Sequence, residues 1–203
     1  RVTNNPADNE LVVAKYDSGA GNDRQWYLGV SPGSINFAMH SLDAGTQSNT
    51  SFALTFATDI WYFAAGVSRA GAAELWVGDE NTPVRLVANT TNFADLTAQA
   101  GVFSIGCYSH NGSVRADTTF DGYIDEVRVF AEALSTSSIM AYYNNGVSGV
   151  APYMRAYYKL DHASGDAVDL TGYIETALTN TNTVEQQSIE LPFKDNGIFF
   201  WPF

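Results

Sequence analysis

Cysteine is almost absent from this 203-residue sequence, which contains Cys107 alone. A single cysteine excludes an intramolecular disulfide framework, and the apolar context VFSIGCY favours a small, buried side chain. No run of about 18 apolar residues occurs, so we expect no membrane insertion. Basic residues are also few, because 10 Lys and Arg stand against 22 Asp and Glu, a net charge of −12. This balance argues against nucleic acid or an anionic membrane as a partner.

Several motifs of catalytic and metal sites are missing as well. The segment GVSPG, 29–33, has the spacing of a nucleophile elbow, but Pro32 has no N–H for an oxyanion hole and the next residues predict a strand. The histidines His40, His110 and His162 are scattered and show no metal or triad spacing. No D-x-[DN]-x-[DN]-G loop occurs, which excludes an EF-hand.

Apolar and aromatic residues are plentiful. They make up 45% and 13% of the chain, against 16% charged residues, so a sizeable core is expected and disorder is not. Short strand-like segments such as 10–16, 25–30, 34–41 and 51–58 alternate with turn-rich pieces such as SPGS and GDENTP. This pattern predicts an antiparallel sandwich.

One helix is predicted, over TSSIMAYYN. Ser135 can cap its start, and Asn145-Gly146 supplies a left-handed stop. A helix of about nine residues is marginal alone, so we expect it to pack on the sheets.

The stretch FDGYIDEVRVFAEAL, 120–134, places an aspartate among apolar residues. Period-two alternation would put Asp125 on the same inward face as Val127 and Val129, while Glu126 and Arg128 form a weak pair in water. A buried carboxylate needs a cation or several hydrogen-bond donors.

This stretch and the predicted helix resemble the laminin-G-like branch of the concanavalin A-like lectin and glucanase superfamily. Domains of that branch close with a glycine, a hydrophobic-Asp-Glu-Val-Arg strand, an Ala-Leu-Ser turn and a short helix. The matching residues are Gly122, Ile124, Asp125, Glu126, Val127, Arg128, Ala133, Leu134 and Ser135. Looser matches extend the resemblance over roughly residues 10 to 146. The fold it implies is all-β: a concanavalin A-like antiparallel β-sandwich (jelly roll) with one short helix.

The order of the segments departs from that branch, whose domains often open with a Tyr-x-Leu-Asp strand and an Asp-x-x-Gly turn. Here these features come last, at 158–161 and 169–172. We assign 1–150 to a laminin-G-like core and expect 151–203 to complete the same sandwich. The alternatives are a second domain that begins near residue 154 and self-association, in which 154–203 pairs with a neighbouring subunit.

The resemblance also implies a structural Ca²⁺, which the aspartate of the closing strand frequently ligates in this superfamily. Carried over, Asp125 is one ligand and Asp169 a second. Without a metal, Asp125 would accept hydrogen bonds from backbone N–H groups or an arginine. Some relatives cleave polysaccharides, but the glucanase strand Glu-x-Asp-x-(x)-Glu is missing, so we expect no enzyme.

Binding residues usually lie on loops at the end of a sandwich. Trp26, next to the turn GNDR, and Tyr108, His110 and Asn111 in a predicted loop form the candidate ligand site. We expect a non-catalytic binding module on an extracellular, cell or virion surface that recognises a glycan or glycoprotein. The alternative is a structural subunit of a fibre, filament or capsid decoration, assembled through the C-terminal segment.

Overall fold

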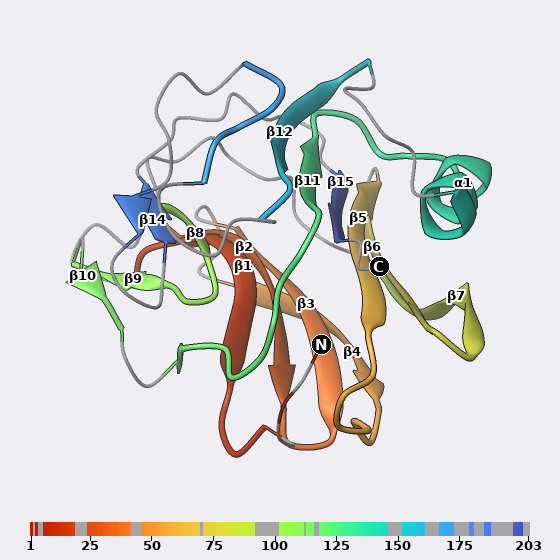
Figure 1. Cartoon of the computed structure of the whole chain (residues 1–203), viewed down its shortest axis with the longest axis horizontal. Helices are drawn as coiled ribbons and strands as arrows, with labels where there is room; N and C mark the ends of the chain where they lie inside the picture. Colours follow the sequence, from red (N-terminus) through yellow and green to blue (C-terminus); the bar gives the residue numbers. More distant parts are fainter. Residues whose placement is uncertain are drawn as a thin grey trace.

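In the described part of the chain, two antiparallel sheets pack as a β-sandwich, with one helix beside one of them (Figure 1). The computed structural model describes residues 1, 3, 6–18, 24–41, 46–69, 71–91, 102–111, 113–115, 118–145, 152–160, 167–172, 179–180, 185–187 and 197–200 of the 203. The predicted all-β sandwich with one short helix is confirmed.

The first sheet has seven strands in the order β13-β14-β8-β1-β2-β3-β4. They are β1 (Glu10–Tyr16), β2 (Arg24–Ser31), β3 (Ser34–Ser41), β4 (Thr46–Ala53), β8 (Phe103–Ile105), β13 (Thr179–Asn180) and β14 (Glu185–Gln187). A separate two-stranded ribbon consists of β9 (Ser109–His110) and β10 (Ser113–Val114). The strand expected over 51–58 is wrong in its extent, because β4 ends at Ala53 and the polar residues before Ser51 belong to it.

The second sheet has six strands in the order β12-β11-β15-β5-β6-β7. They are β5 (Tyr62–Arg69), β6 (Ala72–Asp79), β7 (Thr82–Thr91), β11 (Val127–Phe130), β12 (Met154–Tyr158) and β15 (Gly197–Phe200). In the single chain, β12 pairs with β11, and β15 lies between β11 and β5. The C-terminal segment thus adds strands to both sheets, while its exchange with a neighbouring chain stays a prediction.

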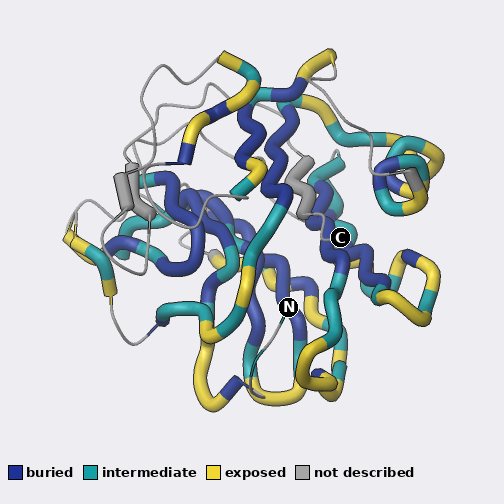
Figure 2. The backbone as a smooth tube through the Cα atoms, viewed as in Figure 1, coloured by how far each residue is buried: buried dark blue, intermediate teal, exposed yellow. Residues whose placement is uncertain are grey.

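The main core lies between the two sheets. Buried residues follow the strands of both layers, and exposed residues gather at many of the turns (Figure 2). Phe37 of β3 faces Gly66 of β5, where an added Cβ would lie 2.4 Å from the Phe37 ring. Glycine at this point lets the two sheets approach closely.

A second apolar cluster covers the outer face of the six-stranded sheet. The helix α1 (Thr136–Asn145) places Ile139 and Tyr142 against Phe63, Trp76 and Phe130. The expected packing of the helix on a sheet is therefore observed.

The start of α1 is capped as predicted. The backbone N–H of Ser138 donates to the Ser135 hydroxyl over 3.1 Å. At the other side of the helix, the Tyr143 hydroxyl donates to the carbonyl oxygens of Asp79 (2.7 Å) and Thr82 (3.1 Å), which ties α1 to the turn between β6 and β7. Gly146, the predicted stop, lies outside the described residues.

Candidate functional site

A groove of about 400 Å³ lies along the outer face of β1, and its volume is in the range of small-molecule sites. Tyrosines line it near the end of β1, and polar side chains line it near the start. The described lining residues are Asp8, Asn9, Leu11, Tyr16, Tyr27, Tyr108, Arg115 and Thr118.

Strand phase places these side chains on one face. Val13 of β1 and Leu28 of β2 are cross-strand partners in the main core, so the next pair, Ala14 and Tyr27, faces outward. A register shift after Lys15 changes the pairing at the end of β1, where Tyr16 lies opposite Arg24. Tyrosines are therefore presented on the face away from the core.

Three tyrosine rings meet at this end of the groove, which we call the tyrosine cluster (Tyr16, Tyr27 and Tyr108). The centre of the Tyr16 ring lies 5.8 Å from that of Tyr27 and 5.0 Å from that of Tyr108, both edge to face. Burial raises the pKa of Tyr16 and of Tyr27, so both hydroxyls stay protonated at neutral pH. The cluster offers partly exposed ring surface together with neutral hydroxyl groups.

Two arginines contact the tyrosine cluster. The Arg115 guanidinium lies 5.5 Å from the centre of the Tyr108 ring and donates to the Tyr108 hydroxyl. The Arg24 guanidinium lies 5.5 Å from the centre of the Tyr16 ring. Each arginine thus makes a cation–π contact with a ring of the cluster.

His40 of β3 packs beneath the cluster. Its ring centre is 5.1 Å from that of Tyr16, and the residue is only 8% exposed. Burial, with a smaller contribution from the charge of Arg24, lowers the pKa of His40 to about 4. The imidazole is therefore neutral at pH 7, and its Nε2 atom has no hydrogen-bond partner in the described part of the chain.

Of the four ligand residues expected from the sequence, Tyr108 lines the groove. His110 and Asn111 lie nearby in the β9–β10 ribbon, where His110 Nδ1 is 2.8 Å from the Ser18 hydroxyl and the Asn111 N–H donates to Asp17. The prediction for Trp26 is wrong. Its side chain is fully buried in the main core, because residues of its strand phase point inward, and it has no surface to offer a ligand.

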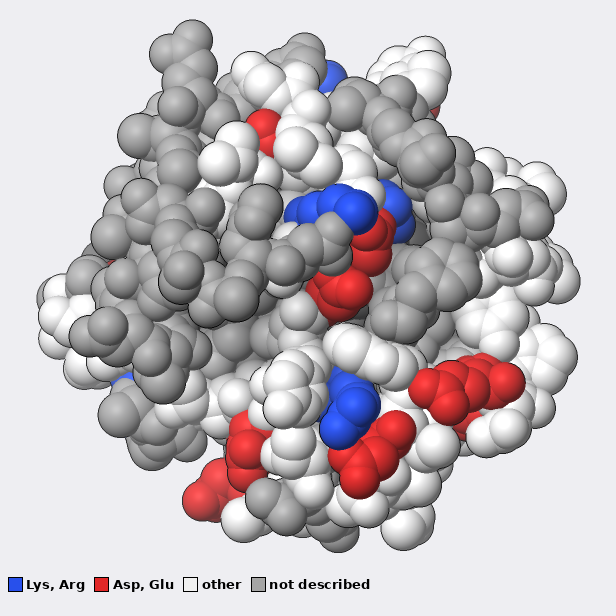
Figure 3. Space-filling view, viewed as in Figure 1, with Lys and Arg blue, Asp and Glu red and all other residues white. Residues whose placement is uncertain are grey.

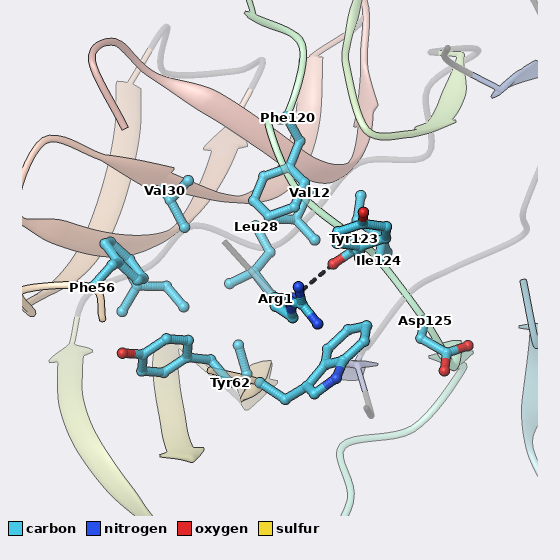
Figure 4. Close-up of a pocket in the computed structure, with 13 residues that line it drawn as sticks. Arg1, Val12, Leu28, Val30, Phe56, Tyr62, Phe120, Tyr123, Ile124 and Asp125 are labelled. Carbon is cyan, nitrogen blue, oxygen red and sulfur yellow. Dashed lines mark hydrogen bonds between the residues drawn. The ribbon is translucent and has the colours of Figure 1, made fainter. Parts of the chain in front are cut away.

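A second, smaller cavity of about 50 Å³ lies between the sheets at one end of the sandwich (Figure 4). Side chains such as Leu28, Val30 and Phe56 make its lining apolar, and Asp125 lies at its edge. In Figure 4 the Asp125 carboxylate points away from Val30 and Phe56. The predicted inward orientation of Asp125 is therefore wrong.

The backbone explains this outcome. The strand begins only at Val127, and Glu126 has a φ of 55°, so the alternation of β11 does not extend back to Asp125. Asp125 Oδ1 accepts a hydrogen bond from the Glu126 N–H over 2.8 Å, which satisfies part of the carboxylate locally.

The pair of Glu126 and Arg128 is buried, and its prediction as a surface pair is wrong. Arg128 does face away from Val127 and Val129, but α1 and β12 cover that face. The Arg128 guanidinium donates to the Glu126 carboxylate and lies 4.3 Å from the centre of the Tyr157 ring. The Tyr157 hydroxyl donates to Glu126 Oε2 over 2.8 Å, so the pair forms a buried polar cluster.

Comparison with protein families agrees with this architecture. A laminin G model, described as the concanavalin A-like lectin/glucanases superfamily, matches residues 1–140. The chain belongs to this superfamily. Searches among curated proteins and among solved structures returned no match. Laminin-G-like domains are typically non-catalytic modules that bind carbohydrate or protein, and they are commonly extracellular.

The calcium site inferred from the superfamily fits the described residues poorly. Asp169 Oδ1 accepts hydrogen bonds from the N–H groups of Tyr157 (2.8 Å) and Thr171 (3.0 Å), and its Oδ2 accepts from the Thr171 hydroxyl. Asp169 therefore lies beside the free edge of β12. Asp125 precedes β11, the strand that pairs with the opposite edge of β12. Within the described ranges, no three His, Cys, Asp or Glu side chains gather as a metal site. Calcium binding by Asp125 and Asp169 stays a prediction.

Five residues that line the groove were not among the ligand residues predicted from the loops: Tyr16, Tyr27, Arg115, Asp8 and Asn9. For Tyr27 the signal was present in the sequence. Trp26, Leu28 and Val30 mark one strand face as inward, so Tyr27 and Gly29 belong to the opposite face. No such signal marks Arg115, which directly follows β10 and lines the groove.

Proposed function

We propose that this protein is a non-catalytic carbohydrate-binding module and that the groove along β1 is its binding site. The observation that carries the proposal is the tyrosine cluster, which lines an open groove of about 400 Å³ together with hydrogen-bonding side chains. The superfamily supports the proposal, because its laminin-G-like members typically bind carbohydrate or protein.

The chemistry of the groove suits a sugar. The apolar face of a sugar ring packs on an aromatic ring, and its hydroxyl groups need donors and acceptors at the rim. Tyr108 and Tyr27 supply ring surface, Asn9 an amide, and Asp8 a carboxylate.

The small number of carboxylates among the described lining residues of the groove supports a non-catalytic role. Glycoside hydrolysis usually requires two carboxyl groups, about 5 Å apart in retaining enzymes and roughly 6.5 to 9.5 Å apart in inverting ones. Among the described lining residues, Asp8 alone carries a carboxylate. The Asp17 carboxylate already accepts hydrogen bonds from the Ser109 hydroxyl and from the Asn111 N–H, and each donor–acceptor distance is 2.9 Å.

An extracellular, cell-surface or virion-surface location is part of the proposal. It is supported by the common extracellular placement of laminin-G-like domains. In the part of the chain that the structure describes, no helix is long and apolar enough to cross a bilayer. Acidic side chains on the face shown in Figure 3 occur in several separate places and do not form one patch.

The test combines a glycan array with calorimetry on matched tyrosine variants. Y108A removes a ring that lines the groove, and Y153A removes a tyrosine that is 54% exposed beside β12. We expect Y108A to weaken binding of an array hit by about two- to thirteenfold, since stacking on one ring contributes roughly 0.5 to 1.5 kcal/mol. Y153A should bind as the parent protein does. An empty array, or equal loss in both variants, would contradict the proposal.

A second candidate is a structural subunit that assembles through its C-terminal segment. The placement of β15 favours it: this strand closes the gap between β11 and β5, so an equivalent strand from a second copy could take the same position. Light scattering at several protein concentrations tests this. A monomer throughout would exclude strand exchange, and open-ended species that disappear when residues 188–203 are deleted would support it.

A further inference from the structure

Each sheet of the sandwich ends in two outer strands. The unpaired N–H and C=O groups of an outer strand can pair with another chain, so folded proteins usually protect such edges. In the described part of the chain, the outer strands are β13 and β4 of one sheet and β12 and β7 of the other. β13 is only two residues long. The edge of β12 is covered, because Tyr157 donates its N–H to Asp169 and its carbonyl oxygen accepts from the N–H of Leu170.

β4 lacks the features that protect an edge. Its eight residues, TQSNTSFA, include no charged residue and no proline, and they pair with β3 without a register shift. A long, regular and uncharged outer strand is a template for pairing with a second chain. Asn49 lies in the middle of this strand and begins the sequence Asn49-Thr50-Ser51, which fits the acceptor pattern for N-linked glycosylation.

β7 is protected over its first half only. Pro83 and Arg85 lie in that half, and a register shift relative to β6 separates it from the rest of the strand. From Ala88 onward, β7 pairs regularly with β6 and carries no charge. A second acceptor sequence, Asn89-Thr90-Thr91, lies in this unprotected half. Both unprotected edge segments therefore contain a glycosylation sequence.

Both asparagines are exposed and point away from the main core. Thr50, next to Asn49, is buried and its hydroxyl donates to the carbonyl oxygen of Ala73 in the main core over 3.5 Å, so Asn49 occupies the opposite face. Ala88, next to Asn89, packs against the main core in the same way. β4 and β7 also contact one another, so the two asparagines lie on strands at one side of the sandwich (Figure 1).

From this arrangement we infer that Asn49 and Asn89 are N-glycosylation sites and that their glycans shield the edges of β4 and β7. The inference rests on the extracellular location that is part of the proposed function, and it does not involve the groove. A bulky, hydrated glycan on an outer strand would collide with any chain whose own strand lay at the pairing distance of about 4.8 Å.

The modification is a group transfer from an oligosaccharide linked to a lipid diphosphate, the donor of the eukaryotic secretory pathway. A bond forms between the asparagine Nδ2 atom and the anomeric carbon of the first sugar. The bond from that carbon to the diphosphate oxygen breaks, and the proton that the amide loses leaves with the lipid diphosphate. No oxidant or reductant is needed.

The sites are tested on the full chain secreted from cultured animal cells. Peptide N-glycosidase in ¹⁸O-water labels each asparagine that carried a glycan, and mass spectrometry of peptides locates the label. We expect label at Asn49 and Asn89, and the loss of one glycan in each of N49Q and N89Q. The matched control is N81Q, because Asn81 is exposed in the turn between β6 and β7 but begins no acceptor sequence, so its variant should keep every glycan.

The shielding role is tested by light scattering. The double variant S51A/T91A keeps both asparagines and removes both acceptor sequences. We expect it to shift to larger species at concentrations at which the glycosylated parent does not. N111Q removes the acceptor sequence in the β9–β10 ribbon, which belongs to neither sheet, and should leave the mass distribution as in the parent. Thermal unfolding of each variant would confirm that it remains folded.

The outcomes separate this inference from the proposed function. Absence of label at either asparagine would overturn the inference for that edge, and equal self-association of the parent and the double variant would overturn the shielding role. An array hit bound by unglycosylated protein from bacteria would support the carbohydrate site whatever happens at Asn49 and Asn89. An empty array together with label at both asparagines would refute the proposed function and support this inference.

Discussion

The buried pair of Glu126 and Arg128 gives the sharpest test of the structure. The side chains of Arg128 and Glu126 are only 2% and 11% exposed, and Arg128 lies against Tyr157 and Tyr142. Removing one partner of a buried pair typically costs about 3 to 5 kcal/mol, because the other charge stays buried without compensation. We expect E126Q to lie near the lower end, about 3 kcal/mol, since a glutamine oxygen still accepts from the Tyr157 hydroxyl.

Urea unfolding followed by tryptophan fluorescence would measure this loss. For a chain of this size, about 3 kcal/mol corresponds to a fall in Tm of roughly 6 to 12 °C. The matched control is D59N, which removes the carboxylate that pairs with Arg1. Those side chains are 71% and 35% exposed, so the expected loss is about 0 to 1 kcal/mol.

A third variant separates charge burial from packing. Replacing both partners, as in E126M/R128M, should cost less than E126Q alone, because no unpaired charge stays buried. A loss for E126Q as small as that for D59N would refute the reasoning. The pair would then lie in water, as period-two alternation over 123–130 predicts.

Three further perturbations have defined outcomes. Because the pKa of buried His40 lies at about 4, below its usual 6.5, protonation favours unfolding; the stabilising contribution is complete above pH 6.5 and is lost as pH falls toward 4. The parent protein should therefore lose about 2 kcal/mol more than H40Q between pH 7 and pH 5 in urea unfolding, and parallel pH profiles would contradict this. G66A should lower the free energy of unfolding by about 1 to 3 kcal/mol, since its Cβ meets Phe37, and an unchanged urea midpoint would show that the sheets are further apart. Burial raises the pKa of Cys107 to about 12, so its reaction with a disulfide reagent at pH 8 should be slow in the folded protein and fast in urea; fast reaction without urea would mean that the thiol is accessible.

Local features of the chain were predictable because they depend on neighbours in sequence. The strands over 10–16 and 34–41 follow from their β-branched and aromatic residues, and both have the predicted bounds. The helix start follows from Ser135, whose hydroxyl accepts from the N–H three residues on. The superfamily was evident from the closing motif around Asp125, and the match to residues 1–140 confirms it.

The candidate site was only partly predictable. Tyr108 was found from its place in a predicted loop, and the phase of Trp26 and Leu28 could have identified Tyr27. Asp8, Tyr27 and Arg115 line one groove from three separate segments, and nothing in the spacing of these residues along the chain indicates that they share it. Trp26 was mistaken for a rim residue because a neighbouring turn does not determine which strand face a side chain occupies.

Short runs of adjacent residues were enough to assign the class of the protein, most of its strand phases, the cap of its helix and its superfamily. Tertiary structure alone decided which faces are covered. A single left-handed residue, Glu126, ended the alternation that would have turned Asp125 inward, and α1 buried an ion pair that strand periodicity placed in water. Periodicity separates two faces of a strand, but the exposure of each face depends on the distant elements that pack against it.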